Sequence, residues 1–296
     1  MADSYDILAI DTVVNPQTPE ILRMRPDFGP RFQQEKFGRD ASVWEGWSHA
    51  RMLEMMDEAG ISHAFLVACK VGQMGLPGSW QLPYEVVADA VQAHPDRFFG
   101  LAGVDPTEGM AGVRALERAV REYGFVGAHG YPHWFELAPD HARWYPLYAK
   151  CVELDIPIQL QVGQSLVYTE ERPLRSVGRP ITLDGVACDF PELRLIGIHV
   201  GIPWTDEMIA MAWKHKNVFI ISDAHAPKYW PASFVNYINS YGRHKVMFGT
   251  DFPVLTFERV RREVEELGLR DEARRLFLRD NTIRVYKLDL PLASAA

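Results

Sequence analysis

The sequence predicts an α/β fold of the (β/α)8 TIM-barrel type in a single domain. Short apolar runs alternate with longer amphipathic stretches roughly eight times along the 296 residues. The apolar runs are continuous rather than alternating with polar residues, which is typical of parallel strands buried on both faces. A (β/α)8 barrel commonly uses about 250 residues, so one domain with one or two long loops fits this length, and an open doubly wound sheet is less favoured.

Eight apolar runs give the expected strands in chain order. They are Ile7–Val13, Ala64–Ala68, Phe98–Val104, Phe125–Ala128, Pro157–Val162, Leu193–His199, Val218–Ser222 and Val246–Gly249. The stretches between them are expected to be helices. Ser42 and Glu45 have the spacing of a capping box at the start of the first long helix, and Gly60 is expected to end that helix.

Two long loops are expected at the C-terminal ends of strands, which is the face where barrel enzymes build their active sites. The first covers about residues 15–40 and contains Arg23, Arg25 and Arg31. The second follows the fifth strand and contains Arg172, Arg175 and Arg179. A guanidinium binds a carboxylate in a bidentate fork, so these arginines, Arg175 included, are expected to bind a substrate carboxylate. For any single arginine, a solvated loop or an oligomer contact is the competing interpretation.

Composition excludes several classes of protein. The formal net charge of -8 argues against nucleic-acid binding, and no apolar run is long enough to span a bilayer. The start of the sequence lacks the basic and apolar stretches of a signal peptide. Cys69, Cys151 and Cys188 are widely spaced, unlike a zinc finger or a disulfide framework. We therefore expect a cytoplasmic protein that acts on a small molecule.

Polar residues at the C-terminal strand ends are the first candidates for chemistry. His199 closes the run Leu-Arg-Leu-Ile-Gly-Ile-His, and Asp251 closes Val-Met-Phe-Gly-Thr-Asp. An imidazole at the mouth of an apolar barrel can act as a general acid or base, and a carboxylate there can accept a proton or orient a water. We expect His199 and Asp251 to be the catalytic pair. Loop capping is the competing interpretation for both.

Further candidates follow two other strands. His129, Tyr131 and His133 form an aromatic and imidazole cluster after the fourth strand, in Ala-His-Gly-Tyr-Pro-His-Trp. His225 lies just past the seventh strand, next to the strand-end residue Asp223. We expect the three histidines and the tyrosine to bind substrate, by stacking or hydrogen bonding. Aromatic clusters and loop histidines are more often structural, so packing remains the alternative.

Five motifs occur in an order that resembles the amidohydrolase superfamily. They are Ala-Ile-Asp-Thr-Val-Val-Asn-Pro, Gly-Phe-Val-Gly-Ala-His, Pro-Ile-Gln-Leu-Gln-Val-Gly, Leu-Ile-Gly-Ile-His-Val-Gly and Phe-Gly-Thr-Asp-Phe-Pro. The chain is most similar to the branch that includes aminocarboxymuconate-semialdehyde decarboxylase, related aromatic-acid decarboxylases and pyrone-dicarboxylate lactonase. The resemblance covers nearly the whole chain, and it implies a homodimer or a higher homo-oligomer.

The resemblance also implies where a metal would bind. The family holds a divalent ion with a His-x-His pair on strand one, a histidine on strand five and an aspartate on strand eight. These positions are Val13, Asn15, Gln161 and Asp251 here, while His199 matches the strand-six histidine that assists proton transfer. Valine has no donor atom, and amide oxygens are weak neutral ligands. We therefore expect no metal and no cofactor, with Asn15 and Gln161 forming neutral hydrogen bonds to substrate; recruiting other histidines would give a non-standard zinc site.

Three functions remain open. The first is hydrolysis of a carboxylated lactone or ester, with Asp251 as general base for water and His199 as the donor to the leaving oxygen. The second is non-oxidative decarboxylation of an aromatic or unsaturated acid, in which either residue delivers a proton to the carbon that loses CO2. The third is a catalytically silent binding protein. The sequence favours the hydrolase.

Overall fold

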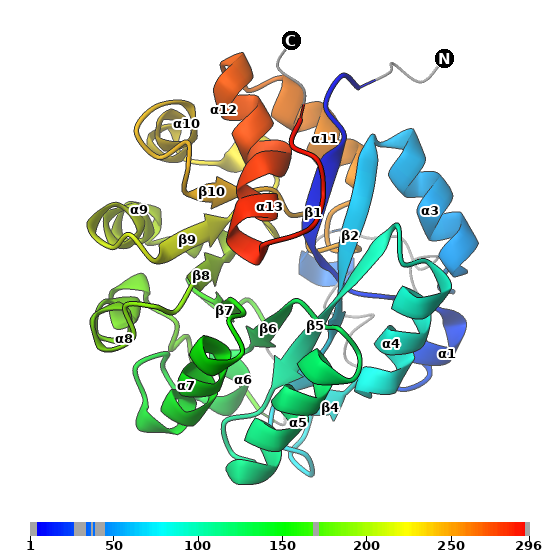
Figure 1. The fold of residues 1–296 in the computed structure, drawn as a ribbon, viewed down its shortest axis with the longest axis vertical. Helices are drawn as coiled ribbons and strands as arrows, with labels where there is room; N and C mark the ends of the chain where they lie inside the picture. The colour runs from blue at the N-terminus through cyan, green and yellow to red at the C-terminus, as the bar shows by residue number, and fades with distance from the viewer. Residues whose placement is uncertain (1–4, 27–33, 37, 39–44, 168–171, 294–296) are drawn as a thin grey trace.

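The protein is a (β/α)8 barrel, as the sequence predicts (Figure 1). The computed structural model describes residues 5–26, 34–36, 38, 45–167 and 172–293. Within them, one parallel sheet runs in the order β1-β2-β5-β6-β7-β8-β9-β10. The strands are β1 Ala9–Val14, β2 Ile61–Ala68, β5 Phe98–Val104, β6 Gly127–Gly130, β7 Ile158–Gln161, β8 Leu195–Ile198, β9 Val218–Ile221 and β10 Val246–Met247.

Helices surround the sheet and follow the strands in turn (Figure 1). The longer ones are α3 His49–Glu58, α4 Tyr84–Ala93, α5 Met110–Arg121, α7 Tyr145–Glu153, α8 Leu183–Asp189, α9 Thr205–Lys214, α10 Ala232–Asn239 and α11 Phe257–Glu265. A last group packs near β1 and β10: α12 Asp271–Arg275, the π-helical turn Leu276–Asp280 and α13 Asn281–Tyr286. Short elements complete the barrel mouth: α1 Pro19–Leu22, α6 Pro132–Phe135 and the hairpin β3 Lys70–Val71 with β4 Trp80–Gln81.

The first long helix begins later than the sequence predicts. Its N-cap is Ser48, whose hydroxyl accepts a hydrogen bond from the backbone N–H of Arg51 at 3.2 Å. The predicted capping box does not start this helix, because Ser48 is its N-cap and Glu45 lies before it; Ser42 itself lies outside the described residues. Gly60 follows this helix with φ +64°, as expected of a glycine that ends a helix.

Side chains and loops, rather than a regular ladder, join β10 to β1. The backbone N–H and the hydroxyl of Thr12 both donate to the carbonyl oxygen of Phe248, at 3.2 and 2.7 Å. Asp11 is fully buried and accepts from the N–H of Thr250 at 3.1 Å and from its hydroxyl at 2.6 Å. The N–H of Asn15 donates to the carbonyl of Phe252 at 2.8 Å. These contacts form the closing seam of the barrel.

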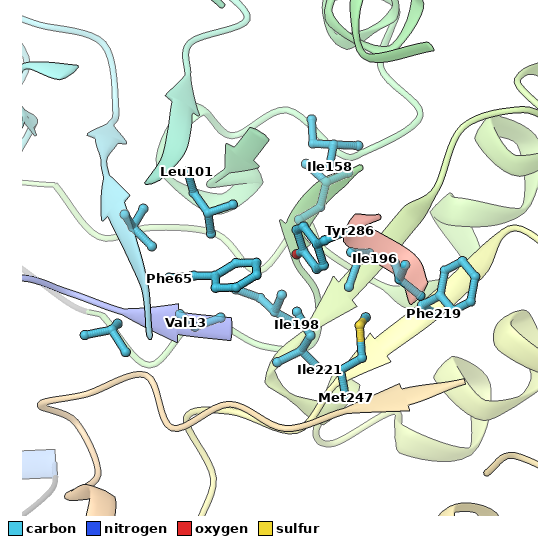
Figure 2. Packing of buried hydrophobic residues seen from close by; sticks show 14 of the residues in the cluster. Val13, Phe65, Leu101, Ile158, Ile196, Ile198, Phe219, Ile221, Met247 and Tyr286 are labelled. Atoms are coloured by element: carbon cyan, nitrogen blue, oxygen red, sulfur yellow. The ribbon is translucent and has the colours of Figure 1, made fainter. Parts of the chain in front are cut away.

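One end of the barrel interior is filled with apolar side chains. Phe65, Leu101, Ile196 and Met247 point inward from four strands and are buried (Figure 2). The ring of Tyr286 from α13 lies among them, 4.7 Å from the ring of Phe65. Because this filled region leaves no space, a polar site has room only toward the C-terminal ends of the strands. Every helix among the described residues is too short or too polar to cross a membrane.

Candidate active site

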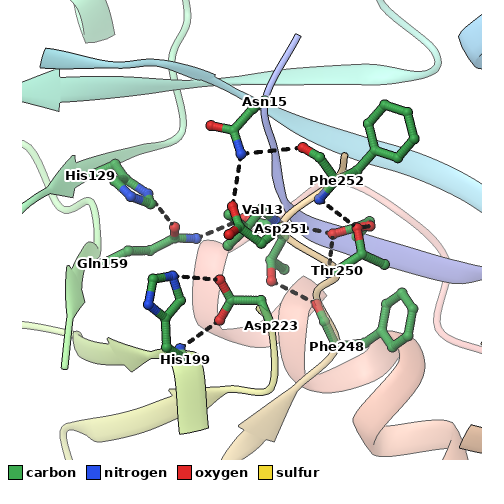
Figure 3. A network of polar contacts seen from close by, with 12 residues as sticks. Val13, Asn15, His129, Gln159, His199, Asp223, Phe248, Thr250, Asp251 and Phe252 are labelled. Atoms are coloured by element: carbon green, nitrogen blue, oxygen red, sulfur yellow. Dashed lines mark hydrogen bonds and ion pairs between the residues drawn. The ribbon is translucent and has the colours of Figure 1, made fainter. Parts of the chain in front are cut away.

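Three neighbouring strands bring His199, Asp223 and Asp251 together at the barrel mouth (Figure 3). His199 directly follows β8, and the two aspartates follow β9 and β10. Their donor atoms all lie within 4.8 Å of one another. The predicted catalytic pair is therefore brought together, and Asp223 stands between its two members in strand order.

The backbone is strained at this site. His199, Ala224 and Asp251 have positive φ values of 69°, 64° and 58°, and the β-branched Val200 has φ 58°. L-residues other than Asn and Asp seldom adopt this conformation, and it costs of order 1–3 kcal/mol per residue. Such strain persists where the surrounding structure imposes it, and it gathers at functional sites. Here it aims the side chains that follow three consecutive strands into one space.

Two buried atoms at the site that could bind a metal ion have no hydrogen-bond partner among the described residues. The backbone N–H of His199 donates to Oδ1 of Asp223 at 2.7 Å, which fixes that carboxylate. The Nε2 of His199 and the Oδ2 of Asp223 are left unpartnered by hydrogen bonds, 3.4 Å apart. An imidazole nitrogen and carboxylate oxygens in such a group are the donor types that divalent transition-metal ions accept. The site therefore has the chemistry of a metal centre.

Burial shifts the protonation of these groups toward their neutral forms. It raises the pKa of Asp251 to about 7, against the lowering effect of the hydrogen bond from Asn15 at 2.8 Å. Burial also raises the pKa of Asp223 well above its ordinary value, and the nearby Asp251 adds to this shift. The pKa of His199 lies well below its ordinary value because of burial. A cation held by His199 and Asp223 would favour the charged form of the Asp223 carboxylate and the neutral form of the imidazole.

A cavity opens in front of these three residues. Five of the predicted site residues line it: His133, Gln161, His199, His225 and Asp251. The loop after β7 supplies another wall through Gln164 and Ser165. Asn15 contacts the cavity through Asp251, to which its amide donates. Burial lowers the pKa of His225 to about 4, so this histidine is uncharged at neutral pH.

His129 and Tyr131 lie on and just after β6, and both are buried. Their rings are 4.6 Å apart. The Nδ1 of His129 lies 2.8 Å from the amide oxygen of Gln159, whose amide nitrogen donates to the carbonyl of Thr12 at 2.9 Å. That arrangement requires His129 to donate from Nδ1, so its unpartnered Nε2 carries a lone pair. Gln159 thus orients a predicted site residue, although no signal in the sequence distinguished it from Gln161.

Arg175 lies away from the cavity. Its side chain is 83% exposed and pairs with Glu136 at 3.2 Å. We expect Arg175→Ala to leave kcat/KM within about twofold of the wild type and to lower the free energy of unfolding by less than about 1 kcal/mol, because exposed ion pairs contribute little. Steady-state kinetics and urea unfolding check this. A tenfold rise in KM would instead show that Arg175 reaches the substrate.

A second group of metal-ligand residues lies on the outer helices. Asp184, Cys188 and His215 place donor atoms within 4.8 Å of one another. The Oδ1 of Asp184 already binds Lys214 at 2.6 Å and His215 at 2.7 Å. This group is satisfied by its own ion pairs and lies on α8 and at the end of α9, apart from the barrel mouth. It serves below as a matched control.

Comparisons with known proteins agree with this geometry. A family model described as Amidohydrolase matches residues 70–288. The gamma-resorcylate decarboxylase of Rhodococcus jostii is 25% identical over 260 residues, covering 69% of this chain and 75% of that protein. The 2-keto-4-carboxy-3-hexenedioate hydratase of a Sphingobium species is 31% identical over 178 residues, 51% of each chain. A dihydroxybenzoic acid decarboxylase from Polaromonas, solved with manganese and 2-nitroresorcinol, has a TM-score of 0.69 at 18% identity and covers 96% of this chain and 98% of its own.

The expectation of a site without metal or cofactor is wrong. Manganese is bound in the Polaromonas decarboxylase, and this chain has a His/Asp/Asp ligand group at the barrel mouth. The prediction rested on the family's metal positions, where Val13, Asn15 and Gln161 have lost the usual ligands and Asp251 keeps one, and it considered only other histidines as replacements. It missed Asp223, which was visible as a polar residue at the end of a strand. The loss of ligands from strands one and five therefore does not dismantle the site.

Proposed function

Because this chain belongs to the amidohydrolase family, we propose that it is a metal-dependent decarboxylase of a small hydroxylated aromatic or unsaturated carboxylic acid. The observation that carries the proposal is the convergence of His199, Asp223 and Asp251 beside the cavity, where Nε2 of His199 and Oδ2 of Asp223 lie 3.4 Å apart and have no hydrogen bond. Decarboxylases among the relatives of this chain support the reaction, and manganese in one of them supports the metal.

His199 and Asp223 would hold the ion through Nε2 and Oδ2, two buried atoms that have no hydrogen bond and lie 3.4 Å apart. Asp251 is left free to transfer a proton, because its carboxyl group lines the cavity beside them. Carboxylate ligands suit manganese, whereas the imidazole is a ligand type that zinc and iron also accept. When bound, a divalent ion supplies positive charge that holds the oxygens of an anionic substrate and stabilises negative charge that develops on them. Asn15 fixes the Asp251 carboxylate by donating to its Oδ1.

The reaction requires one proton at carbon. The bond between the carboxylate and the adjacent carbon breaks, CO2 leaves, and the electron pair of that bond stays on the carbon, which takes up a proton. Asp251 is the residue placed to deliver that proton, because its carboxyl group lines the cavity, whereas Asp223 is fully buried and does not line it. A general acid in such a position contributes roughly 10²–10⁴-fold to a rate.

Arg25 places a cation near the same carboxylates. Its guanidinium lies over the ring of Trp80, 4.8 Å from the ring centroid, and its charge lowers the pKa of Asp251. A buried cation at the mouth raises the local concentration of an anionic substrate and offsets the charge of the carboxylates around it. Arg25 is thus the arginine of the first long loop whose charge acts on the site, although it does not line the cavity.

Hydrolysis of a lactone or ester, which the sequence favours, has less support than decarboxylation. Catalysis is common to both interpretations, and the chain is an enzyme of the amidohydrolase superfamily. The relative that acts as a hydratase adds water to a carboxylated substrate, and its similarity extends over about half of each chain. Incubation of the metal-loaded protein with carboxylic acids and with lactones therefore distinguishes the three reactions by their products. Decarboxylation releases CO2, hydration gives a hydrated acid, and hydrolysis gives a ring-opened lactone.

We expect one manganese ion to bind per chain and to be required for turnover. Removing metal with a chelator should abolish CO2 release from 2,6-dihydroxybenzoate (γ-resorcylate), and added Mn²⁺ should restore it. Asp223→Asn should weaken Mn²⁺ binding by at least about 10–100-fold, because it replaces a charged ligand oxygen at the site. Isothermal titration with Mn²⁺ and analysis of metal content measure this.

Asp184→Asn is the matched control, since it makes the same change in the outer ligand group. It should leave Mn²⁺ affinity unchanged. Equal weakening by both substitutions, or full turnover in metal-free protein, would contradict the proposed metal site. If the metal-loaded protein hydrates an acid without releasing CO2, the proposed metal site stands and the proposed decarboxylase function is wrong.

A further inference from the structure

The polar side chains on one wall of the cavity are all uncharged among the described residues. They are His133 from α6, Gln161 from β7, and Gln164 and Ser165 from the loop after β7, with Trp134, Leu166 and Val167 beside them. Among the described residues that line the cavity, none is lysine or arginine. The described arginines of the loop after β7 are engaged elsewhere: Arg172 with Ser79 and the carbonyl of Trp134, Arg175 with Glu136, and Arg179 with Glu207. Among the described residues, this wall therefore places no charged side chain against the cavity to balance a carboxylate.

His133 has a fixed tautomer. Its Nδ1 lies 3.1 Å from the backbone nitrogen of Val177, which can only donate, so Nδ1 must accept. Burial lowers the pKa of His133 to about 4, and the imidazole is therefore neutral at neutral pH. A neutral imidazole that accepts at Nδ1 carries its proton on Nε2. That Nε2–H is buried and has no partner among the described residues.

The surrounding backbone holds this imidazole in place. Gly163 and Gly178 form an antiparallel bridge, with the N–H of Gly163 donating to the carbonyl of Gly178 at 2.8 Å. A Cβ at Gly178 would lie 2.7 Å from the Gln161 carbonyl and 2.8 Å from Cε1 of His133, so the loop can pack on the ring only because residue 178 is glycine. His133 itself is 2% exposed. The donor is thus fixed before any ligand enters.

We propose that His133 forms a subsite for an uncharged oxygen of the substrate, such as a ring hydroxyl, and that the substrate therefore carries one carboxylate rather than two. The inference rests on the proposed function, in that the carboxylate beside His199 and Asp251 is the group removed. The Nε2–H of His133 would otherwise stay buried without an acceptor, which is unfavourable. A second carboxylate against this wall would lose its hydration without gaining a cation.

Three ligands that differ at one ring position test the subsite. 2,6-Dihydroxybenzoate has a hydroxyl at this position, salicylate has hydrogen, and 3-hydroxyphthalate has a carboxylate. Titration calorimetry on the manganese-loaded protein measures binding of each. Wild type should bind 2,6-dihydroxybenzoate roughly 5–10-fold more tightly than salicylate, as expected for one neutral hydrogen bond. It should bind 3-hydroxyphthalate more weakly than either.

Two substitutions separate the donor from the structural role of His133. In His133→Asn, the amide oxygen can still accept from Val177 but the donor at the Nε2 position is lost. In His133→Gln, the donor at that position is kept and the acceptor is lost. We expect the asparagine variant to lose the preference for 2,6-dihydroxybenzoate over salicylate, and the glutamine variant to keep most of it. Thermal unfolding of both variants reports the structural effect independently.

The binding result and the decarboxylation result can fail separately. If the preference depends on His133 but no CO2 is released, the subsite stands and the proposed reaction is wrong. If CO2 is released but the asparagine variant keeps the wild-type preference, the reaction stands and the subsite is wrong. Tightest binding of 3-hydroxyphthalate, or binding of none of the three acids by wild type, would also overturn the subsite.

Discussion

Asp251→Asn should lower turnover by about 10²–10⁴-fold while leaving the fold intact, as expected for loss of a general acid. Asparagine is the right replacement because it tolerates the left-handed backbone that Asp251 adopts at φ 58°. Its side-chain oxygen can also keep the 2.8 Å hydrogen bond from Asn15. CO2 release at saturating Mn²⁺, with metal content measured on the same sample, separates loss of the proton donor from loss of the ion.

Asp206→Asn makes the same chemical change at an exposed position on α9 and serves as the control. It should retain wild-type turnover and stability. If Asp251→Asn keeps turnover within about threefold of wild type at full metal occupancy, the assignment of Asp251 as the proton donor is wrong.

Asp11→Ala should lower the free energy of unfolding by about 3–5 kcal/mol, because it leaves three buried donors of the closing seam without an acceptor. These donors are the N–H groups of Val13 and Thr250 and the hydroxyl of Thr250. Asp11→Asn keeps one oxygen for the two N–H groups and offers an N–H to the threonine oxygen. We expect it to cost about 1 kcal/mol or less at pH 5. Urea unfolding of metal-free protein measures both.

The same residue predicts a pH dependence with a definite sign. Burial raises the pKa of Asp11 from 3.8 to about 7 in the folded protein. Between these values the folded state binds more protons than the unfolded state, so this carboxyl makes the free energy of unfolding fall as pH rises from about 4 to about 7. Asp11→Asn removes that effect. Its stability relative to wild type should therefore improve from pH 5 to pH 8, and an unchanged difference would refute the shift.

The strands could be predicted because each is a continuous apolar run, and such runs are a local property of the sequence. All eight expected runs contain or overlap the observed strands, although β8 ends at Ile198, one residue before the predicted end. Helix starts were harder to predict, because Ser42 and Ser48 are both good N-caps in isolation. Only the packing of the following helix against the barrel distinguishes them.

The candidate site could be predicted in part. His199 and Asp251 follow directly from their positions at strand ends, and the structure brings them together. Asp223 occupies the same kind of position but gained no role, because the family pattern directed attention to Val13, Asn15 and Gln161. The pairing of a backbone N–H with one oxygen of Asp223, which leaves the other oxygen unpartnered, is a tertiary feature that the sequence does not encode locally.

The contacts of the closing seam determine when the barrel can close while the chain is being synthesised. Phe248 is held on one side by Thr12 and on the other by the carbonyl of Phe277 in the π-helical turn, which accepts its N–H at 3.0 Å. Thr12 precedes Phe248 by 236 residues, and Phe277 follows it in the last group of helices. A nascent chain that has not yet emerged beyond the π-helical turn therefore exposes an unclosed edge at β1. Barrel closure is therefore a late event of folding, and a chain truncated before the π-helical turn lacks this closing contact.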